Sequence, residues 1–216
     1  MQYRDACQQI LETVQKLVSI NLIRLSAGNI SVRLEDGTIV ITPSGVGYDV
    51  LKAEDMVLMD LHNQKLSGSY QPSSEKALHT AIYRSKPEVN AVVHTHSMYA
   101  TAFSSVNMEL PVISIEVMSA GGPIPVAAYR CPGTDAVGEV VVEQFRQRPG
   151  LKGVMMKNHG LVTFGLTLEK AYQTAYEIET GAQIYHLALQ TGRQPEGLTP
   201  EQVQEIYDVY HSPKKN

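Results

Sequence analysis

The chain has 216 residues, of which 43% are hydrophobic, and its formal net charge at pH 7 is −4. This length and composition predict one compact domain over residues 1–216. The slightly acidic balance offers no basic surface for nucleic acid and favours a small-molecule partner. No apolar run approaches the roughly 20 residues of a membrane span, and a signal peptide is not evident. The two cysteines form no disulfide-like pattern, which fits a cytoplasmic protein.

The first part of the chain alternates between helical and strand patterns. Apolar residues at helical spacing predict an amphipathic helix over residues 6–25. Two β-rich runs, 29–34 and 38–42, flank an Asp-Gly dipeptide, which is a strong hairpin signal. A third strand is expected at 56–61 and a helix at 73–86.

The second part continues the alternation. A strand at 89–96 leads into a short helix at 97–105, which is expected to begin on a serine cap. A threonine can cap the next helix, 134–146. Strands are expected on both sides of His159, followed by a long helix at 167–190.

The sequence Thr199-Pro200-Glu201-Gln202 predicts the start of a last helix, because it combines a cap, a proline at the first helical position and a capping-box glutamine. The hairpin signals argue against a purely parallel, doubly wound sheet. We therefore expect the α/β class, as a three-layer α/β/α domain with a mixed, largely antiparallel central sheet.

The most informative motif is His94-Thr95-His96, which follows the apolar run 91–93. Side chains two apart in a strand point to the same face, so both imidazoles can reach one metal ion while Thr95 faces away. Two polar rings at the end of an apolar run would also be costly to bury without a partner. The motif predicts half of a metal site.

Two further residues could complete this site. His159 follows an expected apolar strand, and Glu75 lies near the start of an expected helix. Three imidazoles and one displaceable carboxylate are typical of an open catalytic zinc site rather than a closed structural one. From the residues alone, a hydrogen-bonded core role for the histidines stays open.

The other histidines are interpreted as surface or core residues, because a single histidine is more often one of these than a metal ligand. They are His62, His79, His186 and His211. A cupin-type site would need a glutamate three or four residues beyond the second histidine of the pair, where Tyr99 and Ala100 stand instead.

Three short polar clusters could hold a phosphate group, since they combine glycines with small hydrogen-bond donors. They are residues 26–29, 42–45 and 72–74. Ser73 and Ser74 make the strongest case, because free amides at a helix start favour an anion. Taken singly, each cluster could equally be a turn or a cap. No dinucleotide or Walker pattern is present, which disfavours a nucleotide cofactor.

In order and spacing, these motifs resemble the class II (zinc) aldolase family, in the fuculose-1-phosphate aldolase group of the aldolase/4-epimerase superfamily. The resemblance covers nearly the whole chain. The segments that carry it are SAGNIS (26–31), ITPSG (41–45), PSSE (72–75), AVVHTHS (91–97), the double glycine (121–122) and NHGL (158–161).

The resemblance implies a role for each matching residue. His94, His96 and His159 would bind Zn²⁺, or another divalent ion such as Mn²⁺ or Co²⁺. Glu75 would be the catalytic acid/base and a fourth ligand when substrate is absent. The implied phosphate pocket consists of Gly28, Asn29, Ser44, Gly45, Ser73 and Ser74.

The implied reaction is the reversible cleavage of a (deoxy)ketose 1-phosphate to dihydroxyacetone phosphate and a small aldehyde. A 4-epimerase or a methylthioribulose-1-phosphate dehydratase of the same fold is the alternative, although the epimerases carry aspartate at the position of Glu75. The family pattern also implies a homotetramer with active sites at subunit interfaces.

One feature of the family is missing. The family's proton-donor tyrosine upstream of the double glycine is absent, and Glu116 or Tyr210 could replace it. The apolar residues Ile115, Val117 and Met118 indicate either a tolerant aldehyde pocket or a strand core.

Overall fold

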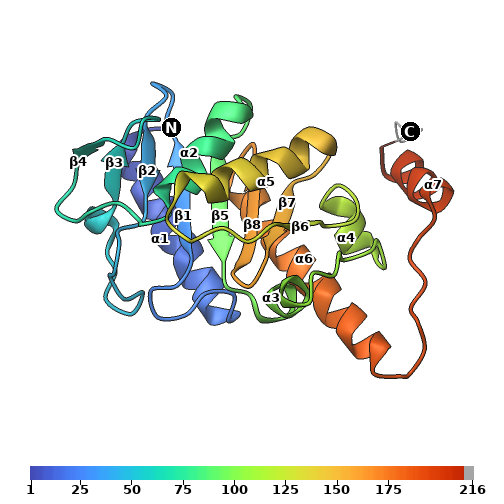
Figure 1. Cartoon of the computed structure of the whole chain (residues 1–216). Helices are drawn as coiled ribbons and strands as arrows, with labels where there is room; N and C mark the ends of the chain where they lie inside the picture. Colours follow the sequence, from blue (N-terminus) through green and yellow to red (C-terminus); the bar gives the residue numbers. More distant parts are fainter. Residues whose placement is uncertain (212–216) are drawn as a thin grey trace.

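The structure, a computed structural model, describes residues 1–211 and is built around one eight-stranded sheet (Figure 1). The strand order is β4-β3-β2-β1-β5-β8-β7-β6, and every neighbouring pair is antiparallel except β6 and β7. The strands are β1 (Asn29–Arg33), β2 (Ile39–Ile41), β3 (Val57–Met59), β4 (Lys65–Ser67), β5 (Ala91–Thr95), β6 (Val126–Ala127), β7 (Gly153–Met156) and β8 (Gly160–Gly165).

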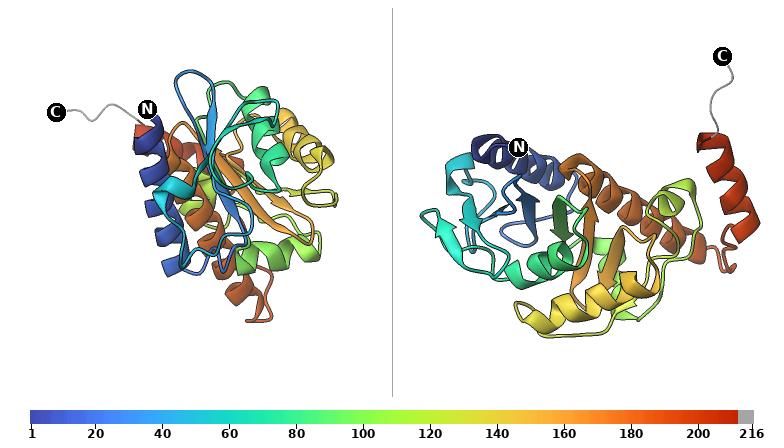
Figure 2. Two further views of the ribbon diagram at one scale, coloured as in Figure 1. Left: turned by 90° about the vertical axis from the view of Figure 1, so that its left-hand side faces the viewer. Right: turned by 90° about the horizontal axis from the view of Figure 1, so that it is seen from above.

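Helices cover both faces of the sheet. Seen edge-on, α1 and α6 lie on one side and α2 and α5 on the other, while α7 stands apart at one end (Figure 2). Helices α3 and α4 pack against α6. The helices are α1 (Tyr3–Ser19), α2 (Lys76–Ser85), α3 (Met98–Ser105), α4 (Ile115–Ser119), α5 (Asp135–Gln147), α6 (Leu168–Leu189) and α7 (Pro200–His211), with a 3₁₀ turn at Ala53–Asp55. Within residues 1–211, none of these helices is both long and apolar enough to cross a membrane.

The central position of β5 explains its apolar sequence. Every residue of β5 is buried, because the strand has neighbours on both edges and helices over both faces. The edge strand β4 is exposed along its whole length. The expected three layers and largely antiparallel sheet are thus confirmed.

The first helix ends earlier than the sequence predicts. It stops at Ser19 rather than near residue 25, and the chain then turns through Asn21, whose φ is +61°. Asparagine tolerates this left-handed conformation better than most residues. The turn directs Leu22 and Ile23 into the core, where they are 2% and 1% exposed, so their apolar character reflects tertiary packing rather than a longer helix.

Three other elements were not predicted. β4 and β6 are only three and two residues long, too short for a clear periodic signal. Residues 115–119 form α4, so the interpretation of Ile115, Val117 and Met118 as a strand core is wrong. Val117 packs closely against Gly181 of α6, where a side chain would not fit.

The predicted caps are partly confirmed. Thr199 and Gln202 bond reciprocally at the start of α7, as the sequence predicts. Thr167, for which no cap was predicted, accepts a hydrogen bond from the backbone N–H of Lys170 at the start of α6. The serine cap of α3 is wrong, since the Ser97 hydroxyl pairs with that of Thr95. A carboxylate from another helix caps α3 instead: Glu179 of α6 accepts the backbone N–H groups of Tyr99 and Ala100 at 2.9 Å each.

The cap at Thr134 is also wrong. The Thr134 hydroxyl donates to the carbonyl of Cys131 rather than accepting from the first turn of α5. The helix nevertheless begins where the sequence predicts, at Asp135. Both cysteines are free thiols, Cys7 buried and Cys131 exposed.

Candidate metal centre and polar cavity

Four side chains from distant parts of the sequence meet at one end of the sheet. Glu75 directly precedes α2, His94 lies in β5 with His96 just beyond its end, and His159 lies in the turn between β7 and β8. Their candidate ligand atoms all lie within 4.8 Å of one another. The structure therefore brings together all four residues that the sequence predicts for the metal site.

The β7–β8 turn is shaped by the residues on either side of His159. Asn158 has a φ of +56°, a left-handed conformation that asparagine adopts more readily than most residues. At Gly160, a Cβ atom would collide with the carbonyl oxygen of Thr95. These two neighbours let the turn approach β5 closely, so that His159 reaches the other ligands.

In its neutral form the His94 ring has a bare nitrogen, Nε2, that faces the other candidate ligands. Nδ1 lies 2.9 Å from the carbonyl oxygen of Leu161, which can only accept, so Nδ1 carries the proton. Nε2 lies 3.0 Å from Oε2 of Glu75 and 3.0 Å from Nε2 of His96. A lone pair facing a carboxylate is unfavourable unless a cation lies between them. A metal ion fits this donor set, and the carbonyl bond at Nδ1 is the usual outer partner of a ligand histidine.

The charges in the cluster are strongly coupled. Burial opposes ionisation of Glu75, but the imidazoles of His94 and His159 hold the pKa of its carboxyl well below the usual range. Burial lowers the pKa of His94, yet the Glu75 carboxylate outweighs this effect and raises it. Burial and the neighbouring histidines lower the pKa of His96 to about 4, so its ring is neutral at pH 7 and can bind a metal. The Glu75 carboxylate thus attracts positive charge to this point.

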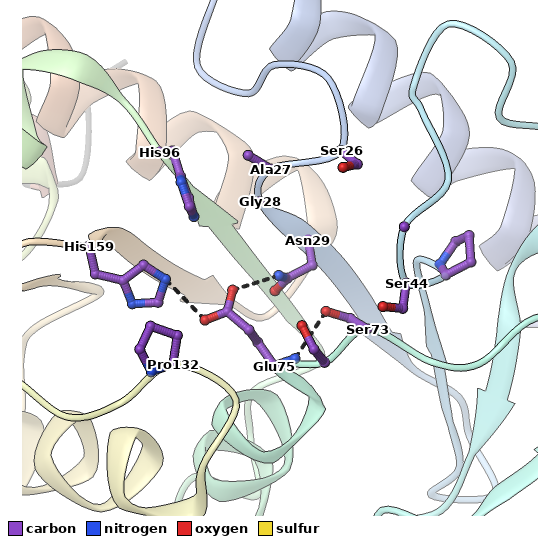
Figure 3. A pocket seen from close by; sticks show the side chains of 13 residues that line it. Ser26, Ala27, Gly28, Asn29, Ser44, Ser73, Glu75, His96, Pro132 and His159 are labelled. Carbon is purple, nitrogen blue, oxygen red and sulfur yellow. Dashed lines mark hydrogen bonds and ion pairs between the residues drawn. The ribbon is translucent and has the colours of Figure 1, made fainter.

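A cavity of about 310 Å³ opens beside the four residues (Figure 3). Its walls contain all six residues that the resemblance assigns to a phosphate pocket and three of the four candidate metal ligands. The lining residues are Ser26, Ala27, Gly28, Asn29, Pro43, Ser44, Gly45, Ser73, Ser74, Glu75, His96, Pro132 and His159. No lysine or arginine is among them, so an anion here would be held by hydroxyl and amide groups.

Two backbone amides around the cavity, those of Ser73 and Ser44, are not free to bind an anion as the sequence led us to expect for Ser73. The backbone N–H of Ser73 donates to the carbonyl of Thr42, and that of Glu75 donates to the Ser73 hydroxyl oxygen. The Ser73 amide is therefore not free, and its contribution to an anion site would come from its hydroxyl. Ser44 is similar, since its amide donates to the carbonyl of Gln71.

Glycine is required at Gly28 for two reasons. Its φ is +90°, and a Cβ atom there would lie 2.7 Å from the carbonyl oxygen of His94. Gly45 also has a positive φ, of +73°, but a Cβ there would meet no atom within 4 Å. Gly28 therefore brings the first polar loop against β5, while Gly45 leaves open space beside the cavity.

Of the two proposed substitutes for the missing tyrosine, the structure locates the side chain of Glu116 alone, and it does not line this cavity. Glu116 belongs to α4 and is not among the lining residues, and the same holds for Ile115, Val117 and Met118. The side chain of Tyr210 lies outside the described residues.

Sequence reasoning missed two contributors. Pro132 lines the cavity, and Glu179 caps the helix that follows His96. Pro132 belongs to a Pro-Gly turn whose place beside the cavity has no local signal.

Comparison with known proteins decides the family. The model for the class II aldolase and adducin N-terminal domain matches residues 8–186. The chain belongs to this class II aldolase family. It is 37% identical over 186 residues to the L-fuculose phosphate aldolase of Escherichia coli strain K12, covering 86% of this chain and 84% of that protein.

Two other class II aldolases are similar over more of the chain. The 5-deoxy-D-ribulose 1-phosphate aldolase of Bacillus thuringiensis serovar kurstaki is 34% identical over 200 residues, 92% of each protein. A solved L-fuculose 1-phosphate aldolase superposes with a TM-score of 0.88 at 29% identity, covering 95% of this chain and 96% of that one. The resemblance predicted from the motifs is confirmed.

A metal-content measurement tests the ligand assignment. We expect the purified chain to carry zinc by elemental analysis and His94→Asn to bind it at least 10–100-fold more weakly, the loss typical even of an outer-shell partner. The matched control is His62→Asn, because His62 is an exposed histidine that belongs neither to the ligand group nor to the cavity lining. Equal zinc in both variants after dialysis would contradict the assignment.

Proposed function

We propose that the protein is a zinc-dependent aldolase that reversibly cleaves a (deoxy)ketose 1-phosphate to dihydroxyacetone phosphate and a small aldehyde. L-Fuculose 1-phosphate and 5-deoxyribulose 1-phosphate are the leading candidate substrates. One observation carries the proposal: a buried carboxylate, Glu75, lies among three imidazoles at the wall of a cavity lined with hydroxyls and glycines. The names of the aldolases to which the chain is similar support the substrate class.

The chemistry explains why both a metal and a carboxylate are needed. The proton α to a ketone is too weakly acidic for an unaided carboxylate at neutral pH. A divalent ion held by His94, His96 and His159 would act as a Lewis acid on the substrate's carbonyl oxygen. Glu75 would then have only to move the proton.

The electrostatics of Glu75 suggest how its basicity is controlled. A carboxylate whose pKa is held far below its usual range is a poor base. Movement away from His94 and His159 would restore its ordinary proton affinity. We infer that substrate binding displaces Glu75 from the imidazoles and thereby turns it into the base.

The phosphate would occupy the polar cavity. The hydroxyls of Ser44, Ser73 and Ser74 and the amide of Asn29 are neutral donors, and Gly28 and Gly45 let the backbone come close. Such donors can hold a doubly charged phosphate near the start of α2, where the helix dipole is positive.

Cleavage itself can be tested by a coupled assay for dihydroxyacetone phosphate. We expect release from fuculose, 5-deoxyribulose and methylthioribulose 1-phosphates, with loss of activity after prolonged chelation and recovery with zinc. Borohydride added with substrate should not trap the enzyme, because no lysine lines the cavity. Xylulose 5-phosphate formed from ribulose 5-phosphate, or water lost from methylthioribulose 1-phosphate, without dihydroxyacetone phosphate would favour the epimerase or the dehydratase.

Replacement of the base gives a second test. Glu75→Gln keeps the shape of the side chain but removes its proton affinity, so kcat should fall on the order of 10²-fold or more. Zinc should still be present, because the three histidines remain. Glu196→Gln is the control, since this exposed glutamate should tolerate the same change. A Glu75→Gln rate within about threefold of the parent would exclude Glu75 as the base.

We also propose a cytoplasmic homotetramer with active sites at subunit interfaces. The separation of α7 from the rest of the described chain is consistent with a role in contacting a neighbour (Figure 2). Light scattering at assay concentration should give the mass of four chains. An active monomer would rule out sites completed by a neighbouring subunit.

A further inference from the structure

Two rows of polar side chains meet in the core beneath the metal centre. On α2 and the residue before it, Glu75, His79 and Tyr83 recur every four positions, which places them on one face of a helix. On β1, Asn29 and Ser31 alternate and so point to one face of the sheet. Helix α2 covers one face of the sheet (Figure 2). Hydrogen bonds join the two rows of side chains.

The rows form one continuous hydrogen-bonded chain that starts at the proposed base. The Asn29 amide nitrogen donates to Oε2 of Glu75 at 2.9 Å, and Nε2 of His79 lies 2.5 Å from Oδ1 of Asn29. The Ser31 hydroxyl lies 2.6 Å from Nδ1 of His79 and 2.8 Å from the Tyr83 hydroxyl. Exposed fractions are 4% for Asn29, 1% for Tyr83 and 0% for His79 and Ser31.

Counting protons fixes the direction of every bond in this chain. An ionised Glu75 can only accept, so Asn29 must turn its nitrogen toward Glu75 and its oxygen toward His79. That oxygen also only accepts, so His79 must carry its proton on Nε2. A neutral ring then has a bare Nδ1, which must receive the Ser31 proton, and Tyr83 must donate to Ser31.

The protonation states required by this count agree with the environment. Burial lowers the pKa of His79 to about 3, so the ring is neutral at physiological pH. Burial also raises the pKa of Tyr83, so its hydroxyl keeps the proton that it donates. His79 and Tyr83 are therefore both neutral at physiological pH.

The bond from His79 holds the Asn29 amide in the orientation that Glu75 requires. A flipped Asn29 would place its oxygen against the carboxylate and its nitrogen against the Nε2 proton of His79, so two contacts would become repulsive at once. The two ends of an amide are nearly equal in size, so size alone does not orient it. The orientation comes from its two bonding partners, with Glu75 accepting at one end and His79 donating at the other.

We propose that His79 is a positioning residue: its Nε2–H fixes the amide of Asn29 so that Asn29 presents N–H groups to Glu75 and to the phosphate cavity. His79 is not among the residues that line the cavity, and its ring bonds to Asn29 on one side and Ser31 on the other. The inference deepens the proposed function and rests on it wherever activity is the readout.

Two variants separate positioning from stability. His79→Phe fills a similar volume but removes the donor, so kcat/KM should fall about tenfold or more, the scale of leaving one buried polar group without its partner. Tyr83→Phe removes a hydroxyl from the same buried chain but leaves the His79–Asn29 bond in place. We expect it to lower the melting temperature while kcat/KM changes less than about twofold. Similar activity losses at similar melting temperatures would overturn the proposal.

A double-mutant cycle with Asn29→Ala tests whether His79 acts through Asn29. In that background there is no amide to orient, so His79→Phe should change kcat/KM by less than about twofold. Its effect on the melting temperature should persist, because the buried Ser31 hydroxyl still loses its partner. An undiminished effect on kcat/KM in the Asn29→Ala background would exclude the proposed route.

The tautomer of His79 can be measured without any substrate. Long-range ¹H–¹⁵N spectra of the zinc-loaded wild-type protein should show the proton on Nε2, with the His79 signals identified by their loss in His79→Gln. A proton on Nδ1 would overturn the inference whatever the enzyme cleaves. If no ketose 1-phosphate is cleaved but the Nε2 proton is found, the proposed function fails while the positioning of Asn29 stands.

Discussion

The structure depends on one buried negative charge. Glu75 is 7% exposed and ionised, and an isolated carboxylate in such a place would cost far more free energy than a domain of this size can spare. Its oxygens are met by His94, His159 and Asn29, each from a different element. The relative positions of β1, β5, α2 and the β7–β8 turn are therefore set by how closely they must approach this carboxylate, and the same approach creates a metal site.

The close approach is made possible by the backbone at a few positions. β5 receives two turns against its last residues, one at Gly28 and one at Gly160, and neither position has room for a Cβ atom. Asn29 and His94 are register partners on adjacent strands, so the first polar loop and the first histidine reach the same end of the sheet together. The glycines in these motifs thus serve packing as much as substrate binding.

The sequence predicted the metal-site residues but missed several contacts between distant elements. His94-Thr95-His96 was recognisable because the whole signal, two histidines at strand spacing directly after an apolar run, lies within six residues, 91–96. The cap of α3 could not be predicted, because Glu179 lies 80 residues from Tyr99 and 79 residues from Ala100 along the chain. The helix at Ile115–Ser119 was hidden for a similar reason: its β-branched residues suit a strand, but packing of Val117 on α6 overrides that preference. His79 looked like an ordinary core histidine because its partners lie on another element.

The hydrogen-bonded chain from Tyr83 to Glu75 lowers the stability of the core, which argues that it serves the site. A core position filled by His79 or Ser31 contributes less to stability than a well-packed apolar side chain, and a network of this kind is favourable only when every member is satisfied. Here each donor between Tyr83 and Glu75 has one acceptor, and the direction of all four bonds follows from the charge at one end. The Nε2–H of His79 selects the same orientation of the Asn29 amide as that charge does. The network therefore ties the orientation of the Asn29 amide, which lines the cavity, to the negative charge on Glu75.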